Sequence, residues 1–72
     1  MDITKAKIGS TYVVDSIGGR EKVQRFLLSL GCYPGERITL VNILAGNYII
    51  TIKDSRFALD QETAQAVTVK MD

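Results

Sequence analysis

The sequence contains no histidine and only one cysteine, Cys32. Histidine is the commonest general base and metal ligand in proteins, so the usual centre of acid–base catalysis is absent. One cysteine without histidine cannot form a Cys–His nucleophilic pair, a zinc site of the usual kind or an internal disulfide. A chain of 72 residues also has no room for a large enclosed substrate pocket. These absences predict a binding protein rather than an enzyme.

Long apolar runs and clustered charge are missing as well. No apolar run approaches the roughly 20 residues of a membrane-spanning helix, and residues 1–5 lack the apolar core of a signal peptide. Nine basic and eight acidic residues, mixed along the chain, give a net charge of +1. Nucleic-acid binders usually carry a clustered basic field, so nucleic acid is not an expected partner. We therefore expect a cytoplasmic protein with no direct membrane insertion.

The sequence also lacks a convincing site for a nucleotide or a metal ion. The glycine pair before Arg20 is too short for a phosphate-binding loop, and Lys22 is not followed by Ser or Thr. The carboxylates of Asp54, Asp60 and Glu62 lie close in sequence and are ligands that a hard cation accepts. Turn formation and helix capping explain them as well. The sequence therefore predicts neither a metal site nor a cofactor.

What the sequence does contain is a series of short β-prone segments. We predict five strands, at residues 11–17, 36–44, 48–53, 57–59 and 67–69, and a turn at Gly46-Asn47. In the second strand the apolar alternation shifts phase between Leu40 and Val41, which indicates a bulge or a strong bend. Many short strands in so few residues favour a small closed β-barrel, with residues 1–72 forming a single, mostly β domain.

One segment, residues 20–30, has the period of a helix. Its apolar side chains form one stripe that is expected to be buried: Val23, Phe26, Leu27 and Leu30. Leu28 lies outside this stripe and is expected to be exposed. Gly31 stands where a left-handed C-cap is expected, because glycine accepts a positive φ without strain. A single helical turn is expected at residues 61–64, after Asp60 as N-cap.

Residues 25–31, Arg-Phe-Leu-Leu-Ser-Leu-Gly, followed by Pro-Gly at 34–35, resemble the FeoA-like family of ferrous iron transport proteins and related domains. The segments 46–52 and 56–59 resemble the same family, and the resemblance extends from about Gly9 to Val69. It implies an SH3-like β-barrel of about five strands, with a helical insertion after the first strand. The chain departs from the family pattern at three positions, Phe26, Cys32 and Asp54.

The resemblance implies a role in bacterial ferrous iron uptake, as an accessory to a membrane permease that carries a cytosolic GTP-binding domain. The protein would lie at the inner face of the membrane through this partner. We expect the partner-binding surface on the helix and the loop after it: Arg25, Leu28, Gly31, Cys32, Tyr33, Pro34 and Gly35. The glycines and the proline also have structural explanations as a cap and a turn. Tyr33 is the aromatic side chain that we expect to be exposed.

Two other functions and the oligomeric state stay open. SH3-like modules of this kind occur at the ends of iron-dependent repressors, where they make intramolecular contacts. The start at Met1 and the lack of DNA-binding helices favour a separate protein instead. The second alternative is a weak transition-metal-binding protein that uses Cys32 and the carboxylates. Small barrels with exposed edges can self-associate, so a homodimer is also open.

Overall fold

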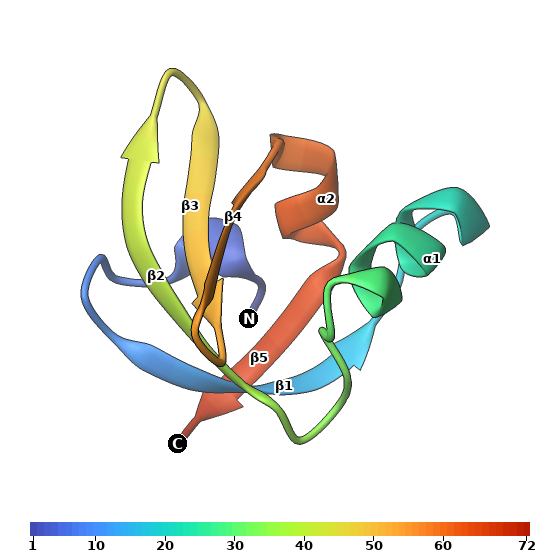
Figure 1. Ribbon diagram of the computed structural model, residues 1–72, viewed down its shortest axis with the longest axis horizontal. Helices are drawn as coiled ribbons and strands as arrows, with labels where there is room; N and C mark the ends of the chain where they lie inside the picture. Colours follow the sequence, from blue (N-terminus) through green and yellow to red (C-terminus); the bar gives the residue numbers. More distant parts are fainter.

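The computed structural model describes all 72 residues, with the elements arranged as Figure 1 shows. The strands are β1 (Thr11–Ile17), β2 (Arg37–Leu44), β3 (Asn47–Ile52), β4 (Ser55–Leu59) and β5 (Val67–Met71). The helices are the 3-10 helix η1 (Ile3–Lys5) and the α-helices α1 (Glu21–Ser29) and α2 (Gln61–Gln65). The five predicted strands and the helix after the first strand are confirmed, whereas η1 was not predicted.

The five strands form one antiparallel sheet in the order β4-β3-β2-β1-β5. The register between β2 and β3 shifts between Leu40 and Asn42, which confirms the bulge predicted from the phase shift at Val41. A second shift, between Val14 and Ser16, lies where β1 pairs with β5. Bulges bend and twist a strand, and in Figure 1 β1 and β5 cross below the other strands.

The barrel is not closed, in contrast to the expectation from the number of strands. β4 and β5 are the two ends of the sheet and do not pair with each other. The chain passes from one to the other through α2, which lies between them in Figure 1. As predicted, Asp60 caps α2: its Oδ1 accepts a hydrogen bond of 2.8 Å from the backbone N–H of Thr63. A short capped helix therefore occupies the place of the last strand pairing.

The core lies inside the bent sheet and is completed by η1, α1 and α2. Ile3 of η1 is fully buried, and the side chain of Asp2 caps this helix by accepting a hydrogen bond of 2.8 Å from the N–H of Thr4. The largest fully buried side chains come from η1, α1, β2, β3 and β4: Ile3, Leu27, Ile38, Leu40, Ile50, Ile52 and Leu59. The N-terminal segment thus belongs to the core.

The helix α1 packs on the core through fewer side chains than its stripe predicts. Val23 and Leu27 are buried and Leu30 is half-buried, but Phe26 is 46% exposed, so its prediction as a core residue was wrong. Figure 1 shows the reason, because α1 stands at one side of the molecule. Leu28 is exposed, as predicted. None of the helices has the length and apolar character required to cross a membrane.

The β2–β3 hairpin extends beyond the core. Its turn consists of Ala45 and Gly46, both with positive φ (51° and 79°), one residue earlier than the predicted turn. Asn47 instead begins β3 and pairs with Leu44. Past the bulge, Ile43 and Leu44 are exposed rather than packed. The outer half of the hairpin therefore contributes little to the core.

Candidate functional site

The end of α1 is fixed by a glycine cap. Gly31 has a φ of +90°. Its N–H donates to the carbonyl of Leu28 at 3.0 Å, and the N–H of Cys32 donates to the carbonyl of Leu27 at 3.1 Å. This satisfies carbonyl groups that the helix end would otherwise leave without partners. The predicted C-cap at Gly31 is confirmed.

The loop after the cap is tied to the sheet at its far end. The N–H of Gly35, which has a φ of +93°, donates to the carbonyl of Val14 at 2.8 Å. The N–H of Glu36 donates to the carbonyl of Tyr33 at 3.0 Å, and this bond closes the turn at Pro34 and Gly35. The loop is therefore a rigid connection that presents the side chains between its two anchored ends.

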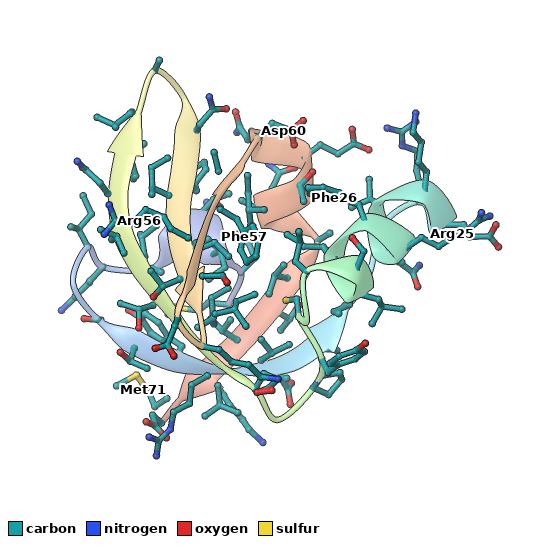
Figure 2. All side chains as sticks on the ribbon, in the orientation of Figure 1. Arg25, Phe26, Arg56, Phe57, Asp60 and Met71 are labelled. Carbon is teal, nitrogen blue, oxygen red and sulfur yellow. The ribbon has the colours of Figure 1, made fainter.

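Most of the predicted partner-binding residues do face the outside. Leu28 is 39% exposed and Tyr33 is 49% exposed, while Arg25 and Pro34 are also exposed. Figure 2 shows Arg25 on the outer side of α1, away from the sheet. Its guanidinium forms an ion pair with Glu21, one helical turn earlier. The structure thus brings a basic residue, a leucine and a tyrosine onto one helix and the loop that continues it.

Cys32 is the exception among these predicted residues. It is fully buried, and burial raises the pKa of its thiol to about 11, with a smaller contribution from the carboxylate of Glu36. A side chain without solvent contact cannot touch a partner, so including Cys32 in the binding surface was wrong. Its interpretation as a small buried apolar residue is confirmed.

Sequence reasoning missed a cleft between α1 and α2. The cleft has a volume of about 320 Å³ and is lined by Arg20, Lys22, Val23, Phe26, Asp60, Glu62 and Thr63. In Figure 2 the ring of Phe26 lies between the two helices. One signal could have revealed it: the single helical turn expected at residues 61–64 is too short to cover an apolar stripe that runs the length of α1. Phe26 is therefore exposed in this cleft, about 200° around the axis of α1 from Leu28.

An ion pair spans this cleft and joins the two helices. Nε and Nη2 of Arg20 donate to the two carboxylate oxygens of Glu62 at 2.6 and 2.9 Å. These hydrogen bonds to Glu62 and the negative charge of its carboxylate raise the pKa of Arg20. Both side chains are more than half exposed, so the pair orients the start of α1 more than it stabilises the fold.

The residues considered as metal ligands do not come together. The structure contains no group of three or more His, Cys, Asp or Glu side chains that could hold a metal ion. Cys32 is buried after α1, whereas Asp60 caps α2 and Glu62 pairs with Arg20. Hydrogen bonds from Thr63 lower the pKa of Asp60, which explains this carboxylate as a cap.

Comparisons with known proteins agree with this architecture. Residues 1–71 match the family described as FeoA domain, while no curated protein matches the sequence significantly. The fold is similar to the crystal structure of an iron uptake regulatory protein (FeoA), with 27% identity over 97% of this chain and 93% of that chain and a TM-score of 0.87. It is also similar to Stenotrophomonas maltophilia FeoA complexed with zinc, with 24% identity over 97% and 89% of the two chains and a TM-score of 0.87.

A related fold occurs within a larger protein. A manganese-dependent transcriptional repressor is 22% identical over 96% of this chain, which spans only 40% of the repressor chain, with a TM-score of 0.88. This likeness shows a shared fold. The Stenotrophomonas protein is described as a prokaryotic SH3 domain protein, so the predicted SH3-like fold with a helix after the first strand is confirmed. Because the family match covers nearly every residue, the chain belongs to the FeoA domain family.

Proposed function

We propose that the protein is a non-enzymatic accessory subunit of ferrous iron uptake that binds the cytosolic part of the GTP-binding ferrous iron permease. Family membership supports the link to ferrous iron transport. The observation that carries the docking role is the pair of exposed apolar side chains at the end of α1 and in its loop, Leu28 and Tyr33. In this proposal the protein acts in the cytoplasm, at the inner face of the membrane.

The rigidity of this surface supports the proposal. Aromatic and large apolar side chains contribute most to binding when they enter a pocket of the partner. The ion pair of Arg20 orients the start of α1, and the cap at Gly31 fixes its end. Leu28 and Tyr33 therefore lose little conformational freedom of the backbone on binding, and less of the interaction energy is spent on ordering.

The experiment is an affinity pull-down with the tagged protein from cells grown in low iron. The wild type should retain the permease, whereas Leu28→Asp and Tyr33→Ala should each reduce its recovery. Leu44→Asp is the matched control, since Leu44 is also an exposed leucine (56%) but lies at the hairpin tip. Recovery that is unchanged by both test variants, or no permease with the wild type, would remove the proposal.

The likeness to a transcriptional repressor favours one second candidate. The protein would then be a regulatory interaction domain that contacts a DNA-binding partner instead of a permease. The same pull-down separates the two, because a repressor would be recovered in place of the membrane protein. A gel shift with operator DNA at physiological salt, with and without that partner, would test the second candidate directly.

A further inference from the structure

A second cleft lies away from α1, where η1, the loop after it and the ends of β1 and β5 meet. Its volume is about 450 Å³, and it is lined by Lys5, Lys7, Ser10, Thr11 and Tyr12 together with Met1 and Met71. We call it the basic–methionine cleft. Figure 2 shows Met71 at the opposite side of the molecule from Arg25 of α1. The cleft is therefore separate from the surface proposed to bind the permease.

The charge of this cleft is not neutralised within the protein. Five of the nine basic side chains form ion pairs, and the four that do not are Lys5, Lys7, Lys22 and Arg56. Two of these four line the basic–methionine cleft. Of the two carboxylates at the chain ends, Asp72 pairs with Arg37 at 3.2 Å, and Asp2 caps η1 by accepting from Thr4 and forms no ion pair with either lysine. The cleft is therefore complementary to an anion.

Two exposed methionines line the cleft with these lysines. Met71 is 79% exposed, the highest value among the large apolar residues, and Met1 is 51% exposed. Ile8, directly after Lys7, is 56% exposed. A soluble anion would use the lysines and leave these side chains in water. Basic residues interleaved with exposed apolar ones are instead typical of surfaces that rest on anionic lipid.

The loop that carries Lys7 is held in place by backbone hydrogen bonds. The N–H of Lys7 donates to the hydroxyl of Tyr12 at 2.9 Å, and the N–H of Ser10 donates to the carbonyl of Lys7 at 3.1 Å. The next contacts reach β2, where Gly9 donates to the carbonyl of Leu40 at 2.6 Å and Leu40 donates to Ser10 at 3.2 Å. The surface is thus preformed, so binding orders little backbone.

We propose that the basic–methionine cleft contacts the anionic headgroups of a phospholipid bilayer. Lys5 and Lys7 approach the lipid phosphates, while Ile8 and Met71 reach the boundary between headgroups and acyl chains. No segment inserts across the membrane. Each lysine strengthens the attraction by only about fivefold, so the contact is weak and salt-dependent. It orients the protein at the membrane and raises its local concentration near a membrane partner while leaving α1 free.

The test is co-sedimentation of the untagged full chain with vesicles of phosphatidylcholine, prepared with and without phosphatidylglycerol. The wild type should bind the vesicles that contain phosphatidylglycerol, and added salt should release it. Lys5→Gln/Lys7→Gln should lower this binding at least about tenfold. Lys22→Gln/Arg56→Gln is the matched control, because it removes the two other unpaired cations and the same net charge. Met71→Ser should lower binding without changing the charge.

Three results would overturn the proposal. The first is equal binding of the wild type to both kinds of vesicle, or binding to neither. The second is an equal loss in both double variants, which would indicate a diffuse effect of net charge. The third is release by inorganic phosphate beyond that by chloride at the same ionic strength, which would indicate a site for a free anion. Recovery of the permease in detergent by Lys5→Gln/Lys7→Gln tests the docking role separately, and circular dichroism checks that the variants fold.

Discussion

The two α-helices are built into the molecule in different ways. α2 has only five residues, yet Asp60 caps it and Thr63 and Ala64 are buried. α1 has nine residues and no side-chain N-cap, and only Val23 and Leu27 are buried. The shorter helix is thus the more completely integrated one.

This difference indicates that α2 supports the fold, whereas α1 mainly exposes side chains at the surface. α2 stands between the two unpaired ends of the sheet, where it replaces a missing strand pairing. α1 is anchored by a few side chains and offers the rest of its surface to the outside. Apolar side chains on a helix therefore do not all contribute to folding, and adjacent residues of α1 should respond very differently to substitution.

The largest effect is expected for the anchor of α1. Leu27 is fully buried, so Leu27→Ala should lower the free energy of unfolding by about 3 kcal/mol through lost burial and a residual cavity. In a domain this small that is a large part of the total stability. Urea unfolding monitored by circular dichroism measures it. A loss below about 1 kcal/mol would show that α1 is not anchored in this way.

The rate at which the Cys32 thiol is alkylated should show how rarely the end of α1 opens to solvent. Because it is buried and its pKa is raised to about 11, alkylation at pH 8 should be at least about 100-fold slower than in the unfolded chain. Leu27→Ala should speed the reaction, since it weakens the packing beside the cap. Mass spectrometry of timed samples gives both rates. Rapid alkylation of the wild type would mean that this end opens readily.

The cap of α2 should make stability depend on pH. The pKa of the Asp60 carboxyl is lower in the folded protein, so its contribution is present above the ordinary pKa of aspartate and is lost as the pH falls through the folded value. Asp60→Asn keeps an accepting oxygen without the charge, so it should show a smaller acid-induced loss in thermal midpoint than the wild type. Identical pH profiles would contradict this role.

The smallest effect is expected one residue after the anchor. Leu28 is 39% exposed, so Leu28→Ala should change the free energy of unfolding by less than about 1 kcal/mol. The two adjacent leucines of α1 therefore form an internal comparison, measured by the same urea unfolding. A loss in Leu28→Ala equal to that in Leu27→Ala would show that the outer face of α1 also supports the fold.

The local features of this protein could be predicted from sequence because they depend on local patterns. Alternation gave the strands, the phase shift at Val41 gave a bulge, and Gly31 and Asp60 gave the two helix caps. Phe26 was misplaced because periodicity identifies a common face of a helix but not how much surface is available to cover it. Cys32 was assigned to the wrong surface because neighbours in a loop, here Cys32 and Tyr33, can point in opposite directions.

Features that depend on contacts between distant segments could not be predicted from local sequence patterns. The count of strands could not show that β4 and β5 remain unpaired, since that depends on the place taken by α2. The basic–methionine cleft joins Lys5 and Lys7 from the start of the chain with Met71 from its end, because β5 pairs with β1. Its one signal in sequence is the proximity of two lysines, which the mixed charge of the whole chain concealed.

The protruding β2–β3 hairpin offers a practical site for engineering. Its tip at Ala45 and Gly46 packs on nothing in the core, so the length of the chain there is not constrained by the rest of the fold. Figure 1 places this tip away from both α1 and the end of β5. A fluorophore or a short affinity peptide inserted between these two residues can therefore report on the proposed permease-binding and lipid-binding surfaces without covering either of them.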